Sequence, residues 1–187
     1  MNDDSYIFKI LVCGPAAVGK TCLVHRYVDN VFLEDTQSTI GVDFSLKNIH
    51  IEAPGSDSDD NRDLPNQGII TLQIWDLAGE EAFREILPYY VQGSHGILFV
   101  FDIAENPDSL VELQDWVDFI KPLLPEVPCV LISTKHDLKP TIPSSEVTTF
   151  SKKNDFNTYY ETSSKKNKNV HEAFVSLAKM VVATDQE

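Results

Sequence analysis

The sequence predicts a doubly wound α/β fold with a mostly parallel, six-stranded sheet and about five flanking helices. Short apolar runs alternate along the chain with stretches of helical length, as in a parallel sheet whose strands are joined by helices. The clearest helix carries its apolar residues on one stripe, at Val170, Ala173, Phe174, Leu177 and Val181. Polar motifs follow several apolar runs, and ligands of such sheets bind beyond the carboxyl ends of the strands.

The strands are expected at residues 6–13, 69–75, 96–101 and 127–132, where apolar runs indicate burial on both faces. A helix is expected over residues 22–29, after a glycine-containing turn. Residues 43–52 are strand-like and are predicted to form the antiparallel edge of the sheet, in a hairpin with residues 69–75.

Residues 53–68 depart from this pattern. They are rich in Asp, Ser, Gly, Pro and Asn and contain almost nothing to bury, so they are predicted to be a mobile acidic loop that lengthens the hairpin connection. Two interpretations remain open. The loop is either a tolerated surface insertion, because loop lengthening costs little stability, or a binding segment for a partner.

Length and charge limit the classes of function. With 187 residues, 42% of them apolar, the chain can build one core, and one domain over residues 1–187 is expected. The formal charge of −14 would repel phosphate backbones, so no nucleic acid partner is expected. A mononucleotide can still bind, because a phosphate site needs only local backbone amides and one or two cations.

The cysteines and the chain ends bear on location. Cys13, Cys22 and Cys129 are widely spaced in apolar surroundings and are expected to be buried free thiols, which predicts a cytoplasmic protein. No signal peptide or membrane-spanning run is present. The last residues form no C-a-a-X lipidation motif, so either a membrane anchor is absent or an anchoring tail is missing from this sequence.

Residues 14–21, GPAAVGKT, match the phosphate-binding pattern G-x-x-x-x-G-K-[ST] between a predicted strand and a predicted helix. The glycines let backbone N–H groups wrap the phosphates, Lys20 supplies a positive charge, and the Thr21 hydroxyl can ligate Mg²⁺. A glycine-rich turn with an exposed lysine is the structural alternative. The nucleotide contacts expected here are Gly14, Ala16, Ala17, Val18, Gly19, Lys20, Thr21 and Cys22.

A carboxylate beyond a second strand completes the predicted metal site. Asp76 ends the run ITLQIW and is placed to hold Mg²⁺. On its own an Asp at a strand end is more commonly a helix cap or turn residue, but the phosphate loop favours the metal interpretation. Gly79 then offers an amide to the terminal phosphate and a hinge that moves when this phosphate leaves.

A third motif distinguishes guanine from adenine. Thr134, Lys135, His136 and Asp137 follow a buried run. One carboxylate can accept both the N1–H and the 2-amino group of guanine, and adenine has no 2-amino group, so Asp137 is expected to select guanine. An ordinary surface turn is the alternative. His136 is expected to be solvated.

With these motifs the chain resembles the Ras superfamily of small GTPases, and within it the Rab branch. The sequences STIGVDF at residues 38–44, LQIWD at 72–76 and ETSSK at 161–165 are similar to Rab switch and base-binding segments. The resemblance implies that Thr39 ligates Mg²⁺ and the γ-phosphate, that Phe32 packs beside the base, and that Lys135 lies along the purine. It further implies base contacts from Ser163, Ser164 and Lys165, and a surface for effectors, exchange factors and GTPase-activating proteins at Phe44, Trp75 and Tyr90. These aromatic residues could instead be core residues.

Two departures from the family pattern concern catalysis and base binding. Glu80 stands where the family usually has the glutamine that orients the attacking water, and a carboxylate cannot donate a hydrogen bond to phosphoryl oxygens. The catalytic residues are therefore predicted to be Glu80, Gly79 and Lys20, with slow intrinsic hydrolysis. Thr134 stands where the family usually has asparagine. Rac-like proteins also have threonine at this position of the motif, so guanine binding should be retained.

The function predicted from these features is a monomeric GTPase domain that cycles between GTP and GDP with Mg²⁺, as in Rab-like vesicle trafficking. A nucleotide-locked GTP-binding scaffold with little or no hydrolysis is the main alternative, because of Glu80. An ATP-using enzyme would require adenine preference, against which Asp137 argues. A purely structural interaction domain would bind no nucleotide at all.

Overall fold

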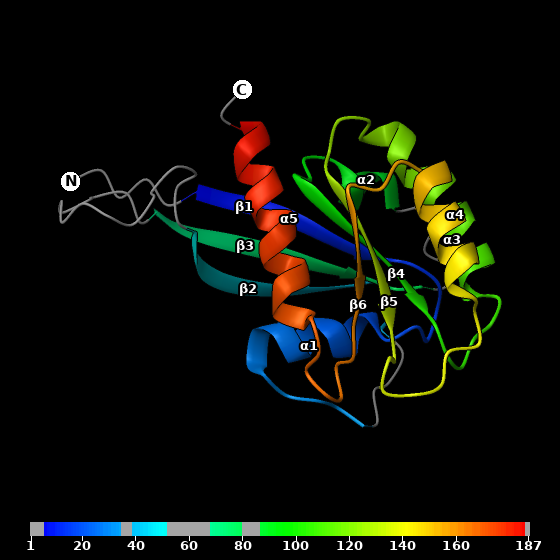
Figure 1. The fold of residues 1–187 in the computed structure, drawn as a ribbon. Coiled ribbons are helices and arrows are strands. Elements are labelled where there is room, and N and C mark those ends of the chain that lie inside the picture. The colour runs from blue at the N-terminus through cyan, green and yellow to red at the C-terminus, as the bar shows by residue number, and fades with distance from the viewer. Residues whose placement is uncertain (1–5, 35–38, 52–67, 80–86, 186–187) are drawn as a thin grey trace, which may run out of the picture.

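Parallel strands form the centre of the computed structural model, which describes residues 6–34, 39–51, 68–79 and 87–185 (Figure 1). The described strands make a six-stranded sheet in the order β2-β3-β1-β4-β5-β6. Their bounds are Tyr6–Cys13 (β1), Val42–Ile51 (β2), Gly68–Leu77 (β3), Gly96–Asp102 (β4), Cys129–Thr134 (β5) and Thr158–Glu161 (β6). The predicted fold class is confirmed.

Helices cover both faces of the sheet (Figure 1). They are Lys20–Asp29 (α1), Leu87–Val91 (α2), Ser109–Ile120 (α3), Ser144–Lys153 (α4) and Val170–Asp185 (α5), with a 3₁₀ turn at Lys121–Leu123 (η2). Buried residues of α1 and α5 share one apolar cluster with one face of the sheet, and those of α2, α3 and α4 share a second cluster with the other face. The stripe predicted on the last helix, from Val170 to Val181, is buried in the first cluster. No helix among the described residues is both long and apolar enough to cross a bilayer.

Strand pairing follows the predicted topology. β1 pairs in parallel with β3 and β4, and β4-β5 and β5-β6 are parallel as well. β2 pairs antiparallel with β3 at the edge of the sheet, as predicted, with Val42 opposite Leu77 and Ile51 opposite Gly68. All the other strands run in one direction, so their carboxyl ends lie at the same end of the sheet. The predicted motifs are found at this end.

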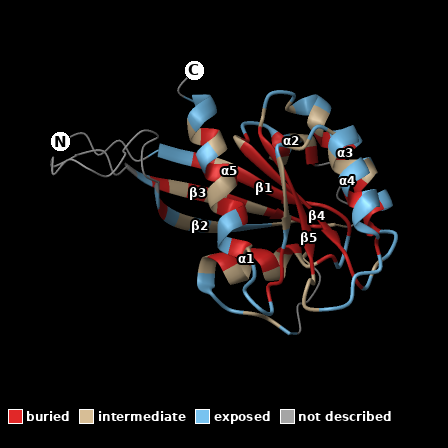
Figure 2. Ribbon diagram, viewed as in Figure 1, coloured by how far each residue is buried: buried red, intermediate tan, exposed pale blue. Residues whose placement is uncertain are grey.

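The two-sided burial predicted for the strands holds in the middle of the sheet and fails near its edge. Every residue of β4 and β5 is buried, because helices cover both of their faces (Figure 2). In β3, buried residues such as Ile70, Leu72 and Ile74 alternate with more exposed ones, of which Ile69 is 47% exposed. The prediction of two buried faces was therefore wrong for β3, since Ile70, Leu72 and Ile74 pack in the first apolar cluster, while the second cluster reaches this strand only near its carboxyl end.

Several element boundaries differ from the predicted ones. β5 begins at Cys129 and not at residue 127, because Pro128 has no N–H to donate to a strand neighbour. The first helix begins at Lys20 instead of residue 22. Of the predicted acidic loop, Gly68 belongs to β3, and residues 53–67 lie outside the described residues. The pairing of Ile51 with Gly68 confirms that this segment connects the two strands of a hairpin.

Candidate functional site

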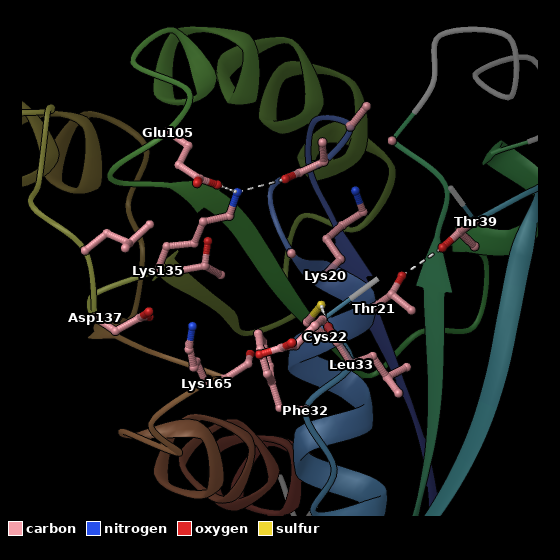
Figure 3. Close-up of a pocket in the computed structure, with 18 residues that line it drawn as sticks. Lys20, Thr21, Cys22, Phe32, Leu33, Thr39, Glu105, Lys135, Asp137 and Lys165 are labelled. Atoms are coloured by element: carbon pink, nitrogen blue, oxygen red, sulfur yellow. Dashed lines mark hydrogen bonds and ion pairs between the residues drawn. The ribbon is translucent and has the colours of Figure 1, made fainter. Parts of the chain in front are cut away.

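A cavity of about 450 Å³ lies beyond the carboxyl ends of the parallel strands (Figure 3). It is elongated between two groups of side chains. Thr21, Thr39 and Lys20 lie at one end, and Lys135 and Asp137 at the other. The residues that line it are Ala16, Ala17, Gly19, Lys20, Thr21, Cys22, Phe32, Leu33, Glu34, Thr39, Gly79, Glu105, Thr134, Lys135, Asp137, Leu138, Ser164 and Lys165. Most of the residues predicted from separate motifs thus surround one cavity.

The loop between β1 and α1 depends on close backbone approaches. Gly14 has φ of 145°, and a Cβ there would lie 2.1 Å from the Val100 carbonyl oxygen of β4, so no side chain fits. Ala17 has φ of 60°, in the left-handed region that costs an L-residue about 1–2 kcal/mol. The loop therefore holds a strained conformation beside the cavity, and its shape is fixed by the neighbouring strand.

Lys20 begins α1 and is buried, with 6% of its surface exposed. Its Nζ donates to the carbonyl oxygens of Gly14 at 3.0 Å and Pro15 at 2.6 Å. Burial lowers the pKa of Lys20 to about 8, although the charge of Asp76 acts to raise it. A lysine held among carbonyl oxygens at the N-terminus of a helix is a cation suited to an anionic ligand.

Asp76, Thr21 and Thr39 bring three oxygen-bearing side chains together. Thr21 Oγ1 donates to Asp76 Oδ2 at 2.5 Å, so Thr39 Oγ1 must donate in the 2.8 Å contact between the two hydroxyls. Asp76 is 2% exposed, and its Oδ1 has no hydrogen-bond partner within the described part of the chain. Burial raises the pKa of Asp76 to about 6, against the lowering effect of its hydrogen bond from Thr21.

This set of oxygen atoms fits a hard divalent cation. Mg²⁺ prefers carboxylate, hydroxyl and water oxygens, and the buried Asp76 Oδ1 is a carboxylate oxygen that lacks a donor. A cation would remove the cost of burying that charge, which the raised pKa of Asp76 reflects. Two of the three predicted metal ligands, Thr21 and Thr39, line the cavity, and Asp76 supports them from behind.

Gly79 lies against the phosphate loop. A Cβ at Gly79 would come within 2.4 Å of Ala16 N and 2.5 Å of Pro15 O. Glycine is needed because the two backbones touch, and this contact brings the Gly79 amide to the same end of the cavity as Lys20. Glu80, which was predicted to be catalytic, lies outside the described residues.

At the other end, Asp137 is held by the loop that follows β6. Ser163 Oγ donates to Asp137 Oδ1 at 2.6 Å. Arg26 of α1 donates from Nε to the carbonyl oxygen of Ser164 at 2.7 Å, which fastens the same loop to the first helix. Ser163 itself is buried and does not line the cavity, while Ser164 and Lys165 do. The hydrogen bond from Ser163 orients the Asp137 carboxylate, and Asp137 lines the cavity. This carboxylate can therefore accept hydrogen bonds from N–H groups of a ligand.

Lys135 is surrounded by acceptors from three elements. Its Nζ lies 2.6 Å from Asp102 Oδ2, 2.7 Å from Glu105 Oε2 and 3.3 Å from the Ala17 carbonyl oxygen. Burial acts to lower the pKa of Lys135, but the two carboxylates outweigh it and hold this pKa above its ordinary value. The ammonium group is thus anchored, and its aliphatic chain forms part of the cavity wall.

Thr134 joins the two ends of the site. Its Oγ1 lies 2.6 Å from the Val18 carbonyl oxygen of the phosphate loop and 3.1 Å from the Phe101 carbonyl oxygen of β4. Among the predicted nucleotide contacts, Gly14, Val18 and Ser163 are not part of the cavity lining. They lie behind it and fix the loops that form it.

Sequence reasoning missed several residues of the site. Leu33, Glu34, Glu105 and Leu138 line the cavity, and Asp102 pairs with Lys135 from beneath it. A signal for Asp102 was present, because it directly follows the buried run of residues 96–101, as Asp76 follows its own run. Its Oδ1 accepts the backbone N–H groups of Ala104 and Glu105, which places Glu105 beside Lys135.

Two expectations about individual side chains were wrong. Cys22 is partly exposed and not buried, because it faces the cavity, whereas Cys13 and Cys129 are buried free thiols as expected. His136 is not a solvated side chain, since only 9% of it is exposed. It turns from the cavity toward the neighbouring strands, where Ser133 of β5 and, through Ser133, Tyr159 of β6 provide polar partners.

The three aromatic residues of the predicted partner surface touch one another. The rings of Phe44 and Trp75 are 5.4 Å apart at 73°, and those of Trp75 and Tyr90 are 5.9 Å apart at 47°. Phe44 is 46% exposed, and the other two rings are partly buried against the second apolar cluster. The core interpretation therefore holds in part for Trp75 and Tyr90, and the role of the three rings in binding partners stays a prediction.

This chain is similar to known proteins over nearly its whole length. Residues 9–183 match the sequence profile of the Ras family. Ras-related protein Rab-7L1 of Rattus norvegicus is 36% identical over 193 residues, which cover 100% of this chain and 88% of that protein. GTP-binding protein ypt4 of Schizosaccharomyces pombe is 33% identical over 180 residues, covering 95% and 72% of the two chains. Ras-related protein Rab-1 of Theileria parva is 36% identical over 182 residues, covering 96% and 76%.

Proposed function

Because this chain belongs to the Ras family of small GTPases, whose members hydrolyse GTP, we propose that it is a switch that cycles between GTP and GDP with bound Mg²⁺. One observation supports the proposal above all others. A single cavity has a guanine-compatible carboxylate, Asp137, at one end and a cation-compatible cluster at the other, where Asp76 supports the lining residues Thr21 and Thr39. A nucleoside polyphosphate has a base and a metal-binding phosphate tail in the same order.

The base end accounts for the choice of guanine. Asp137 Oδ1 already accepts the Ser163 hydroxyl, and each carboxylate oxygen has a second lone pair. The remaining acceptor sites match the two adjacent N–H groups of guanine, and adenine would leave them unpaired at a cost of about 1–3 kcal/mol. Phe32, Lys135 and Lys165 supply the cavity walls around the base.

The phosphate end carries groups suited to the negatively charged phosphates and to Mg²⁺. The amides of residues 16–21 and the ammonium of Lys20 would hold the phosphates, with Thr21 and Thr39 on Mg²⁺ and Asp76 holding it directly or through water. When bound, Mg²⁺ neutralises negative charge that develops on the phosphoryl group. Lys20 exchanges its two carbonyl partners for phosphate oxygens, and the Gly79 amide lies where it can donate to the terminal phosphate.

Hydrolysis is proposed to be slow in the absence of a partner, with Glu80, Gly79 and Lys20 acting on the γ-phosphate. Glu80 would accept a hydrogen bond from the attacking water but cannot donate one to the phosphoryl oxygens. The alternative function is a nucleotide-locked scaffold, in which GTP is bound and not turned over. The acidic side chain at position 80 motivates both proposals.

Switching is proposed to act through the surface formed by Phe44, Trp75 and Tyr90. β2 and β3 connect these rings to the metal cluster, since Phe44 pairs with Trp75 and Asp76 follows directly. Loss of the γ-phosphate would release Thr39 and Gly79 and so change this surface for effectors, exchange factors and activating proteins. We propose a cytoplasmic, monomeric protein without a nucleic acid partner, with a role in vesicle trafficking like that of Rab proteins.

The nucleotide released when the purified chain is denatured tests the proposal. Ion-pair chromatography should find guanine nucleotide near one equivalent per chain, with GDP in excess of GTP. A preparation that releases adenine nucleotide would contradict the assignment of Asp137. A chain that purifies empty and binds neither GDP nor ADP would contradict a nucleotide switch altogether.

Single-turnover hydrolysis separates the switch from the locked scaffold. Glu80→Gln is expected to raise the rate a few-fold with little change in GTP affinity, because the amide restores a donor and removes a charge at the same length. Glu80→Ala is the matched control that removes both functions. A wild-type rate well above both variants would show that the carboxylate itself supports catalysis.

A further inference from the structure

His136 lies between two residues of the base end but does not line the cavity. It lines a second hollow of about 600 Å³, together with Tyr159 and Glu161 of β6 and residues at the start of α4. Only 9% of the side chain is exposed. A nearly buried imidazole needs hydrogen-bond partners within the protein.

The imidazole connects β5 to β6, which lie side by side in Figure 1. His136 Nε2 is 2.6 Å from Ser133 Oγ, and the same Oγ is 2.6 Å from the Tyr159 hydroxyl. His136 Nδ1 is 3.7 Å from Glu161 Oε2. These contacts form a polar chain from the end of one strand to the next, and His136 is its member nearest to Asp137.

Backbone bonds carry the same connection into the loop that holds Asp137. The His136 N–H donates to the Thr162 carbonyl oxygen at 3.0 Å, and the Thr162 N–H donates to the Ser133 carbonyl oxygen at 2.8 Å. Ser163, the next residue, donates to Asp137. Asp137 directly follows His136 in the chain, and Ser163 directly follows Thr162. The network therefore fixes the residue before each partner of the Asp137–Ser163 hydrogen bond.

We propose that His136 is a positioning residue for guanine recognition, and that protonation of its imidazole weakens the hold on the base and speeds the release of GDP. The proposal deepens the proposed function and rests on it, since it requires guanine at Asp137. No contact between His136 and the base is needed, because the residue acts through Ser133, Thr162 and Asp137.

Hydrogen-bond donors in the network allow two arrangements. With neutral His136, the Tyr159 hydroxyl donates to Ser133 Oγ, and Ser133 donates to His136 Nε2, so each hydroxyl has an acceptor. With protonated His136, Nε2–H donates to Ser133 Oγ, so Ser133 can no longer donate to His136, and one of the two hydroxyl protons loses its acceptor in the network. The order of donors and acceptors then changes, and the imidazolium charge acts electrostatically on the neighbouring Asp137 and so competes with the N–H groups of guanine for that carboxylate.

The charges around His136 set the direction of the effect. Burial lowers the pKa of His136 below its ordinary value. Glu161 of β6 and the neighbouring Asp137 act to raise this pKa, and Lys168, from the segment before α5, acts to lower it. The residues of α4 at the hollow, Ser144, Val147 and Thr148, carry no charge. The neutral arrangement therefore prevails at pH 7.5, and the protonated one requires a lower pH than an ordinary histidine does.

The test measures dissociation of a fluorescent GDP analogue from the full chain with saturating Mg²⁺, chased by excess GDP, between pH 7.5 and 5.5. His136→Ala should raise the dissociation rate about tenfold at pH 7.5. His136→Gln should keep this rate close to that of the wild type, because its amide can still bond Ser133. The ratio of the wild-type rate to the His136→Gln rate should rise about threefold or more as the pH falls. His50→Gln, at an exposed position on β2, is the matched histidine control and should follow the wild type.

The ratio between proteins is the readout because Asp76 and the phosphates also titrate in this range. A ratio that stays constant with pH, or a His136→Ala protein that folds and retains GDP as the wild type does, would overturn the positioning role. If His136→Ala does not fold, the pH profile of His136→Gln decides. Failure of the wild type itself to bind GDP would instead overturn the proposed function, so the two failures are distinguishable.

Discussion

The two ends of the cavity are built in different ways. The phosphate end is formed mainly by one contiguous stretch, residues 14–21, at the junction of β1 and α1. The base end is assembled from segments that follow the carboxyl ends of β4, β5 and β6, where Lys135 pairs with Asp102 and Ser163 donates to Asp137. The first depends on local backbone conformation, and the second depends on the order of strands in the sheet.

Their electrostatics differ as well. At the phosphate end, burial shifts the pKa of Lys20 down to about 8 and that of Asp76 up to about 6, so each group is held in an environment that disfavours its charge. At the base end, Lys135 is balanced by two carboxylates, and its pKa lies above the ordinary value. The phosphate end thus gains most from its ligands, while the base end is already paired and mainly selects among them.

The largest expected effect comes from removing the buried cation. Lys20→Ala should weaken GDP binding about a thousandfold, near 4 kcal/mol, because a phosphate would lose a buried, charge-assisted partner. Lys135→Ala is the matched change at the base end and should weaken GDP binding about tenfold, since the Lys135 ammonium is already paired with Asp102 and Glu105. Titration calorimetry on both variants measures the difference, and equal losses would remove the contrast between the two ends.

A smaller effect is expected from changing base selection. Asp137→Asn should weaken GDP binding on the order of a hundredfold and shift preference toward xanthine nucleotides, whose 2-oxo group accepts a hydrogen bond where guanine donates one. Ser163→Ala keeps the carboxylate and removes only its 2.6 Å donor, so a loss of a few-fold is expected. Competition among GDP, XDP and ADP gives the readout. Unchanged GDP affinity in Asp137→Asn would contradict the assignment.

The raised pKa of Asp76 predicts how Mg²⁺ binding depends on pH. The metal requires the carboxylate, so Mg²⁺ affinity should fall about tenfold as the pH drops from 7 to 5, through the pKa of about 6. In protein without nucleotide or metal the sign reverses. The pKa in the folded protein exceeds the ordinary carboxyl value of 3.8, so this group makes the fold more stable as the pH falls from about 6 toward 4.

The comparison with Asp76→Asn isolates this group. The variant should bind Mg²⁺ weakly at every pH, and the Asp76-dependent gain in thermal stability on acidification should disappear. Metal titrations and melting curves of the two proteins at matched pH provide the measurement. Parallel wild-type and variant profiles would contradict the role given to Asp76.

The smallest effect is expected from the segment that connects β2 and β3. Replacing residues 53–67 with an Asn-Gly turn should leave GDP affinity within about threefold, because Ile51 and Gly68 already pair as the end of a hairpin. They lie at the opposite end of β3 from Asp76. Fluorescence titration with a GDP analogue tests this, and a collapse in affinity or folding would show that the segment is part of the site.

The sequence alone determined the phosphate loop, the fold class and the guanine motif, because each rests on local patterns. A glycine-rich stretch between an apolar run and a helix constrains its own backbone, and alternating apolar runs and helices leave few topologies. The six-stranded sheet, with β2 antiparallel at its edge, agrees with that prediction. Local patterns did not give the boundaries at Cys129 and Lys20, since hydrogen-bond partners decide where elements begin. The limits of the domain and the roles of the site residues stay predictions.

Only the tertiary structure decided which side chains pair across the site. Asp102 and Lys135 are far apart in sequence and meet because β4 and β5 are neighbours with Asp102 opposite Thr134. His136 was expected in solvent, but its ring bonds Ser133 of β5, and Ser133 in turn bonds Tyr159 of the neighbouring β6. A pattern in one segment cannot reveal such contacts, because the burial and hydrogen bonding of a side chain depend on segments that only folding brings beside it.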